Sequence, residues 1–166
     1  MDIQFPKSNP KPAVGNQGKL IIVSAPSGGG KTTIVRHLLS GPYNLEFSVS
    51  ATSRGPRDNE VEGFDYYFIS GEKFRQKIDQ GDFLEWEEVY SGVYYGTLKN
   101  EVERILAGGK NVIFDVDVKG GLHIKEFYKE KALSIFVAPP SVEELKIRLR
   151  SRCTETEKKI AVRLAK

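Results

Sequence analysis

Three short apolar runs stand out in the pattern of hydrophobic and polar positions along the chain. They are continuous rather than alternating, and they lie at Lys19–Ser24, at Val112–Asp115 and at Ala132–Ala138. Continuous runs of this length are typical of strands that are buried on both faces of a parallel sheet. A double proline at 139–140 ends the last run, because proline cannot donate to a strand ladder.

Helical patterns separate and follow these runs. The segment after Lys31 repeats apolar residues at helical spacing and ends at a Gly-Pro stop at 41–42. A second helix is predicted over Thr97–Ala107, and a third begins at the capping pair Ser141 and Glu144. Strands that alternate with helices predict an α/β fold with a parallel core sheet and right-handed crossovers.

The stretch from Leu45 to about Gly96 has a different texture. Short aromatic and β-branched pieces alternate there with turn residues and charges, and one helix is predicted around Glu72–Gln80. We interpret this stretch as an inserted, mostly β lobe. Residues 1–17 contain three prolines without apolar periodicity, and they are predicted to form a flexible tail.

Composition narrows the class of protein. The 166 residues carry a net charge of +3 and a single cysteine, Cys153, which favours a reducing compartment and a cytoplasmic protein. No apolar run approaches the length of a membrane span, and the beginning of the chain lacks a signal-peptide core. Basic residues are dispersed, so the charge suits a small anionic ligand rather than nucleic acid.

A glycine-rich loop between the first strand and the first helix carries the clearest chemical signal. Nucleotide phosphates are predicted to bind at Ala25, Pro26, Ser27, Gly28, Gly29, Gly30, Lys31, Thr32 and Thr33. Glycines let backbone N–H groups converge on phosphate oxygens, and the helix directs its positive end at them. We expect Lys31 to reach the β- and γ-phosphates and the Thr32 hydroxyl to bind Mg²⁺. The flanking strand and helix argue against a plain glycine turn.

Two aspartates follow the second apolar run. Asp115 and Asp117 lie two residues apart at the end of a predicted strand, so both side chains are expected on one face. Ligands of open α/β sheets bind beyond the carboxyl ends of the strands. One carboxylate is therefore predicted to support Mg²⁺ or its waters, and the other to contact a base or ribose. A capping role at the strand end is the simpler alternative.

The β lobe concentrates polar groups that suit a second ligand. Arg54 and Arg57 lie three residues apart, and the planar fork of arginine binds phosphate oxygens in pairs. Glu85 lies among aromatic residues, and a carboxylate suits guanine, whose N1–H and amino group are donors on one edge. Each residue also has an ordinary structural explanation. Only their joint occurrence after a phosphate loop favours a binding site.

These stretches together resemble the guanylate kinase family, from about Gly18 to the last residue. The resemblance rests on APSGGGKTT, FSVSATSRGPR, EGFDYYF, FLEW, YYGT, FDVDVKGG, APPSVEELKIRLRSR and TETE. It implies a three-layer P-loop kinase fold with a parallel core sheet, an inserted GMP-binding lobe and a helical lid. It also implies that the γ-phosphoryl group of ATP is transferred to GMP in the presence of Mg²⁺, giving ADP and GDP.

The resemblance assigns roles by matching position. Catalytic roles are implied for Lys31, Arg54 and the lid arginines Arg148, Arg152 and Arg163. The implied GMP contacts are Ser50, Arg54, Arg57, Tyr66, Glu85, Tyr95, Gly96, Thr97 and Asp117, and the implied metal ligands are Thr32 and Asp115. The implied organisation is a tail over 1–17, core segments over 18–46 and 98–147, a GMP-binding lobe over 47–97 and a partial lid over 148–166.

Two departures from the family pattern affect these expectations. Cys153 stands where the lid motif has glycine, so a left-handed backbone there would be strained. The chain ends at Lys166, whereas the family continues with a further strand and helix. We expect the sequence to be part of a longer protein, and the alternative is a truncated product with impaired activity. The rival interpretations are an inactive protein-interaction module, a kinase for another phosphate acceptor and, least favoured, a nucleic-acid ATPase.

Overall fold

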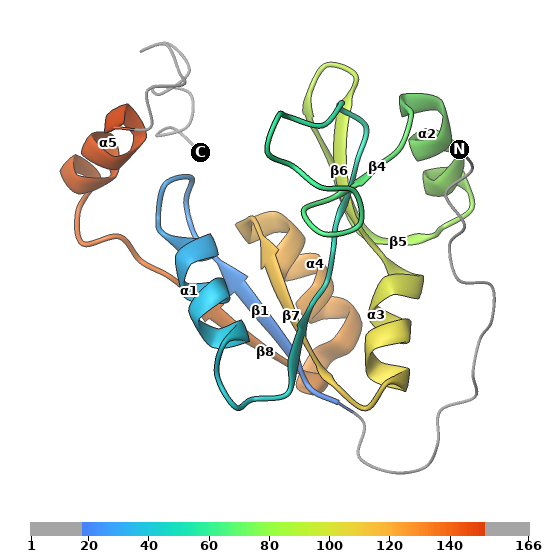
Figure 1. The fold of residues 1–166 in the computed structure, drawn as a ribbon, viewed down its shortest axis with the longest axis horizontal. Helices are drawn as coiled ribbons and strands as arrows, with labels where there is room; N and C mark the ends of the chain where they lie inside the picture. Colours follow the sequence, from blue (N-terminus) through green and yellow to red (C-terminus); the bar gives the residue numbers. More distant parts are fainter. Residues whose placement is uncertain (1–17, 152–166) are drawn as a thin grey trace. The chain divides into compact units, whose positions relative to one another are not determined.

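The computed structural model describes residues 18–151, which are divided between two compact units (Figure 1). The core unit holds Leu20–Phe47 and residues 113–151, and the hairpin unit holds residues 18–19 and Ser48–Val112. The predicted tail and the positions Arg152, Cys153 and Arg163 lie outside the described residues.

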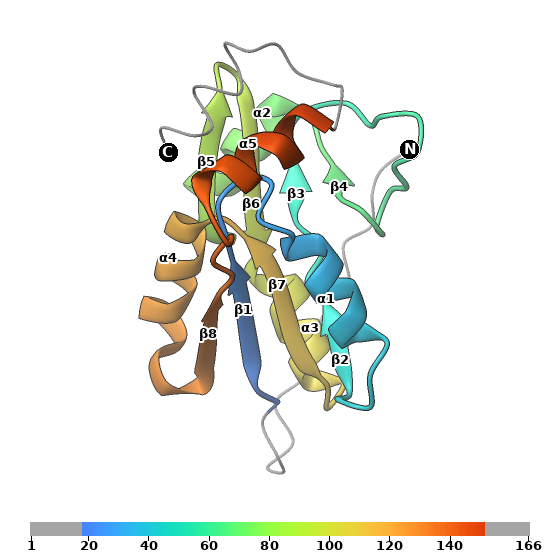
Figure 2. The ribbon, with the colours of Figure 1, turned by 90° about the vertical axis from the view of Figure 1, so that its left-hand side faces the viewer.

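The core unit is built on a four-stranded sheet in the order β2, β7, β1, β8 (Figure 2). β1 pairs with β8 in parallel, from Leu20 opposite Ala132 to Ser24 opposite Phe136. In chain order, the elements are β1 (Leu20–Ser24), α1 (Lys31–Leu39), β2 (Leu45–Phe47), β7 (Asn111–Val116, of which the first two residues belong to the hairpin unit), α4 (Val118–Tyr128), η1 (Lys129–Lys131), β8 (Ala132–Phe136) and α5 (Val142–Ser151). The predicted α/β class with a parallel-strand sheet is confirmed.

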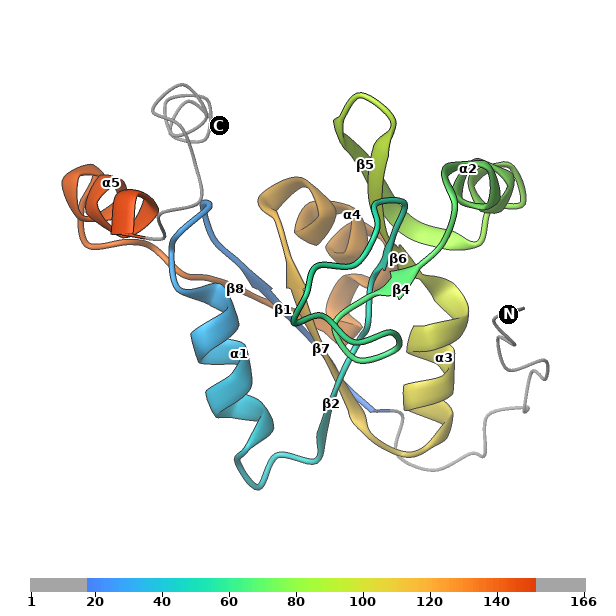
Figure 3. The same cartoon turned by 45° about the horizontal axis from the view of Figure 1, so that its top comes forward.

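Helices α1 and α4 cover opposite faces of this sheet (Figure 3). On the α1 side, Val35 joins Val23 and Ile113 in a buried cluster. On the α4 side, Gly121 faces Ile22 of β1. Because successive strand residues point to opposite faces, the continuous apolar run of β1 serves both helices.

Helix α4 was not expected from the apolar pattern. Two glycines lie in its first turn, and glycine has a low intrinsic helix propensity. A β-carbon at Gly121 would lie 3.2 Å from Cγ2 of Ile22, so close packing on the sheet favours glycine here. The packing that glycine allows therefore outweighs its poor propensity.

Two predicted boundaries were wrong. Thr97 continues β6 instead of opening a helix, because it pairs across the hairpin with Glu85. β8 ends at Phe136 rather than at Ala138. Val137 still donates its backbone N–H to the Ser24 carbonyl at 2.8 Å, and the double proline then stops the ladder.

The hairpin unit contains a second four-stranded sheet, in the order β4, β3, β6, β5. Its elements are β3 (Ala51–Thr52), β4 (Tyr67–Phe68), α2 (Gly71–Asp79), β5 (Phe83–Tyr90), β6 (Val93–Leu98) and α3 (Lys99–Ala107). Phe74 of α2 is fully buried and stacks on Phe83 with ring centroids 4.4 Å apart. The one helix and the mostly β character predicted for residues 45–96 are thus present, but β2 (Leu45–Phe47) belongs to the core sheet and not to the inserted lobe. None of the described helices is both long and apolar enough to cross a membrane.

Candidate active site

The glycine-rich loop joins the carboxyl end of β1 to the start of α1. Gly28 and Gly30 have φ angles of 86° and 91°, a left-handed conformation that favours glycine. The Gly29 N–H donates to the Pro26 carbonyl at 2.9 Å, which closes a turn inside the loop. No side chain caps the start of α1, and its first turn has no acidic residue. The positive end of the helix is therefore arranged to receive an anion.

Helix α5 packs against this loop inside the core unit. A β-carbon at Gly28 would lie 3.1 Å from Cδ2 of Leu149 and 3.3 Å from Cδ1 of Leu145. Both leucines are buried, and together they form a small apolar cluster. Arg148 lies on the same helix, and its Nε donates to the Glu144 carboxylate at 2.8 Å. Helix α5 thus combines an apolar contact to the loop with a paired arginine.

Asp115 of β7 contacts both functional side chains at the start of α1. The Thr32 hydroxyl donates to one carboxylate oxygen at 2.7 Å, and the Lys31 ammonium lies 3.4 Å from the other. The Lys31 and Asp115 side chains are about four-fifths buried, with relative exposures of 20% and 16%. The carboxylate therefore fixes the direction of the lysine and of the hydroxyl before any ligand is bound.

The oxygens of Thr32 and Asp115 suit a hard divalent cation. Mg²⁺ prefers oxygen ligands and usually keeps several waters while it binds one or two carboxylates and substrate phosphates. Within residues 18–151, no group of three or more His, Cys, Asp or Glu side chains could hold a metal by itself. This donor set fits an ion that is brought in with a nucleotide rather than one that the protein holds alone.

Asp117 caps a helix, which is the simpler of the two roles that the sequence predicts for it. Its carboxylate accepts the Gly120 N–H at 2.8 Å and caps α4. The residue is exposed and lies in the core unit, whereas the other predicted GMP contacts lie in the hairpin unit. The cap uses one carboxylate oxygen, so capping alone does not exclude a contact to a ligand.

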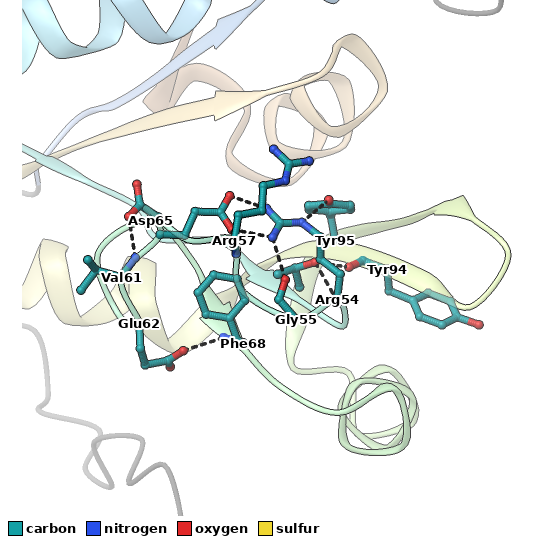
Figure 4. Close-up of polar contacts among 11 residues, drawn as sticks. Arg54, Gly55, Arg57, Val61, Glu62, Asp65, Phe68, Tyr94 and Tyr95 are labelled. Atoms are coloured by element: carbon teal, nitrogen blue, oxygen red, sulfur yellow. Dashed lines mark hydrogen bonds and ion pairs between the residues drawn. The ribbon is translucent and has the colours of Figure 1, made fainter. Parts of the chain in front are cut away.

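Arg54 lies at the centre of a polar and aromatic cluster in the hairpin unit (Figure 4). Its guanidinium makes a paired contact with the Glu60 carboxylate, with Nη2 donating to Oε1 at 2.6 Å. Nε donates to the Tyr95 hydroxyl at 2.9 Å. The guanidinium carbon lies 5.1 Å from the Tyr66 ring centroid and 5.7 Å from that of Phe68. Ion pairing and aromatic faces thus hold the cation in one place.

The Arg54–Glu60 pair shifts the pKa of both partners. The hydrogen bond from Arg54 lowers the pKa of Glu60 to about 2, and the hydrogen bond to Glu60 raises the pKa of Arg54 above its ordinary value. Both groups are therefore charged throughout the physiological pH range. Arg57, in contrast, is exposed, and its guanidinium has no hydrogen-bond acceptor among the described residues.

Glu85 and Thr97 face each other across the β5–β6 hairpin. The Thr97 hydroxyl donates to Oε1 of Glu85 at 2.6 Å, and Thr97 is fully buried. Gly96 precedes Thr97 on β6. A β-carbon at Gly96 would be 2.8 Å from the Glu85 carbonyl oxygen and 2.8 Å from Cδ1 of Phe83. Ser50, at the entrance to β3, accepts the Tyr67 N–H with its carbonyl. This hydrogen bond fixes the backbone at Ser50.

Two members of the Arg54 cluster were not predicted. These are Phe68 and Glu60, which the sequence patterns above do not assign to a site. The signal available in the sequence is spacing, since a carboxylate follows Arg54 by six residues and Arg57 by three. Glycine, proline and asparagine in this segment predict a turn, and a turn brings such residues together.

A parallel strand, a glycine loop and an uncapped helix, with an aspartate on the adjacent strand, define a nucleotide-binding protein of the phosphate-loop class. A family model described as "Guanylate kinase" matches residues 17–166. The chain belongs to the guanylate kinase family.

Several relatives resemble the chain over most of its length. The guanylate kinase of Bacteroides thetaiotaomicron is 56% identical over 149 residues, which are 90% of this chain and 73% of the relative. That of Porphyromonas gingivalis is 56% identical, over 89% of this chain and 79% of the relative. The crystal structure of guanylate kinase from Anaplasma phagocytophilum is similar with a TM-score of 0.69 and 33% identity, over 90% of this chain and 72% of that one.

Proposed function

We propose that this protein transfers the γ-phosphoryl group of ATP to GMP, giving ADP and GDP. The observation that carries the proposal is the joint contact of Lys31 and Thr32 with Asp115 at the start of α1, in a chain of the guanylate kinase family. An interaction module without catalysis would not need this arrangement. The retained loop glycines and Lys31 therefore favour the enzyme.

The core unit is proposed to bind ATP. The loop from Ala25 to Thr33 would surround the phosphates with backbone N–H groups, and Lys31 would turn from Asp115 to the transferring phosphoryl group. Arg148 would add positive charge from α5. We also propose the lid roles of Arg152 and Arg163, which lie outside the described residues.

Mg²⁺ is the proposed cofactor. Thr32 and Asp115 would hold it directly or through its waters, and the ion would neutralise charge on the phosphates. Removal of the metal with EDTA is expected to abolish ADP formation, and excess Mg²⁺ should restore it. Turnover that persists in EDTA would contradict the metal assignment.

The hairpin unit is proposed to bind GMP. Arg54, Arg57 and Tyr66 would contact the phosphate, with Tyr95 beside them. The proposed guanine contacts are Ser50, Glu85, Gly96 and Thr97, with Asp117 contributing from the core unit. The Glu85 carboxylate would accept the N1–H and the amino group of guanine. Adenine lacks this pair of donors, so AMP is expected to be a poor acceptor.

The remaining organisation is proposed on the same basis. The core segments over 18–46 and 98–147 would bind ATP, the lobe over 47–97 would bind GMP and the partial lid over 148–166 would cover ATP. Residues 98–112 of this proposed core lie in the hairpin unit. ATP and GMP would be the partners, without nucleic acid, and the cytoplasm is the proposed location.

The decisive experiment measures ADP formation by the 166-residue chain with ATP and Mg²⁺. GMP, AMP or no acceptor is added in parallel reactions. ADP formation that depends on GMP, and not on AMP, is the expected result. Equal rates with and without GMP, or a preference for AMP, would overturn the proposal.

A further inference from the structure

Four of the five N–H donors of Arg54 already have acceptors. Nη1 and Nη2 each donate to one oxygen of Glu60, Nη1 also donates to the Gly55 carbonyl at 2.9 Å, and Nε donates to the Tyr95 hydroxyl at 2.9 Å (Figure 4). The exposures of the Arg54 and Glu60 side chains are both 15%. The guanidinium is therefore locked in position and orientation, and its planar geometry decides where the last donor points.

That last donor belongs to Nη2, and no described residue accepts it. In a planar guanidinium, one N–H of Nη2 faces the Glu60 side and the other lies on the edge shared with Nε. The Tyr95 hydroxyl lies at this edge, accepts from Nε and keeps its own hydrogen for a further acceptor. An oxyanion at this edge could accept from Nη2 of Arg54 and from the Tyr95 hydroxyl together.

Glu60 also fixes the backbone of the second arginine. Its Oε2 accepts the Arg57 N–H at 2.9 Å, and its own N–H donates to the Arg57 carbonyl at 3.0 Å. The Arg57 guanidinium points away from these contacts in Figure 4. One carboxylate thus holds the side chain of Arg54 and the main chain of Arg57 in a fixed relation.

We propose that Glu60 is a positioning residue for the acceptor phosphate, which it orders through Arg54 and Arg57 without touching it. This inference rests on the proposed function, since it assigns the phosphate of GMP to these two arginines. Without Glu60, Arg54 keeps its charge but can rotate to other acceptors. GMP binding must then order the guanidinium, which costs free energy. The cost falls on GMP binding, because the ATP site does not include this cluster.

The test is the variant Glu60→Gln, which keeps the size and one acceptor oxygen but removes the charge. The KM for GMP is expected to rise about tenfold, because a charge-assisted paired contact is lost. The kcat and the KM for ATP should stay within about twofold of the wild-type values. Glu62→Gln is the matched control, because Glu62 lies in the same segment but accepts from the Phe68 N–H at 2.9 Å. Its KM for GMP should not change.

A double-mutant cycle separates positioning from a general structural effect. Arg54→Lys alone should raise the KM for GMP, and Glu60→Gln should add a smaller rise in that background than in the wild-type protein, because only its effect through Arg57 remains. Additive effects, or an unchanged KM in Glu60→Gln, would overturn the inference. A lowered KM would overturn it too, because Glu60 would then be a competitor of the phosphate.

Folding is monitored by thermal unfolding of each variant. If Glu60→Gln does not fold, Glu60→Asp tests the same point, since it keeps the charge but withdraws it by one methylene. The same direction of change in the KM for GMP is expected from it. Wild-type protein that lacks GMP-dependent turnover would overturn the proposed function, whereas normal wild-type turnover with an unaffected Glu60→Gln would overturn only the role of Glu60.

Discussion

Lys31 and Thr32 are adjacent in sequence, yet they reach different oxygens of the same aspartate. This division follows from the start of α1, where successive side chains leave the helix about 100° apart. Asp115 stands in for the negative charge that a nucleotide would bring. Nucleotide binding would then require Lys31 to exchange Asp115 for a phosphate oxygen, and this limits how much of the site has to be reordered.

The variant Lys31→Met tests this arrangement at one residue. Methionine is of similar length but has no charge, so kcat is expected to fall by about a thousandfold or more, since charge neutralisation is the main task in phosphoryl transfer. The variant is expected to remain folded, because methionine can occupy the space of the apolar lysine stem, and thermal unfolding checks this. Near-normal turnover in the folded variant would contradict the assigned role.

Glu85→Gln tests base recognition. Glutamine replaces one acceptor oxygen by a donor that faces the donors of guanine, so the KM for GMP should rise by about one to two orders of magnitude. The KM for ATP is expected to stay unchanged. Glu88→Gln on the same strand is the control, because Glu88 accepts the Gly92 N–H at 2.7 Å and lies outside the proposed site. Equal effects of the two substitutions would count against guanine recognition by Glu85.

At the scale of elements, β4 and α3 are joined by a polar network around the buried carboxylate of Glu101. The Tyr67 hydroxyl donates to Glu101 at 3.2 Å, and Arg104 pairs with the same carboxylate through two nitrogens at 3.0 Å. Glu101 is only 4% exposed. Burial, followed by the nearby charge of Glu101, raises the pKa of Tyr67 to about 12.

This raised pKa predicts a loss of stability in alkali. The pKa of Tyr67 is about 10 in the unfolded chain and about 12 in the folded protein. The stabilising contribution is complete below pH 10 and is lost as the pH rises through 12, since only the unfolded chain readily releases the proton. Tyr67→Phe should weaken this decline and cost about 1 kcal/mol at neutral pH. Denaturant unfolding at several pH values measures both, and an identical alkaline decline in the variant would contradict the prediction.

The elements whose hydrophobic patterns are local could be predicted from the sequence. The elements and contacts that depend on packing between distant residues could not. The three apolar runs and the glycine loop follow from neighbouring residues alone. α4 was missed because Gly121 is chosen by its contact with Ile22, which lies almost a hundred residues earlier. Glu60 was missed because only the folded turn brings it to Arg54. Which side chains share an acceptor, as Lys31 and Thr32 share Asp115, also needs the fold.

For the molecule as a whole, the predicted ligand contacts separate by unit. The loop from Ala25 to Thr33 lies in the core unit, and of the predicted GMP contacts only Asp117 lies outside the hairpin unit. Each ligand alone is therefore expected to act mainly on one unit.

Hydrogen exchange is the appropriate measurement. GMP alone should slow exchange of backbone amides in residues 50–57 and 94–97, because binding stabilises the segments that carry its contacts. ATP with Mg²⁺ should slow exchange in residues 25–33. Protection of the loop by GMP with no change in the hairpin unit would contradict the assignment of ligands to units. Guanosine, which lacks the phosphate, is the control and should leave the exchange rates of residues 54–57 unchanged.

The tight surroundings of Gly96 have a consequence for inhibitors. Resistance usually arises when a target exchanges a residue that the drug touches but that the protein can spare. At Gly96 even alanine would place an atom 2.8 Å from a backbone carbonyl and 2.8 Å from a buried ring. A guanine analogue that contacts the main chain at Gly96 would therefore be difficult to resist by mutation at this position. Any substitution there would disrupt the packing of the protein itself.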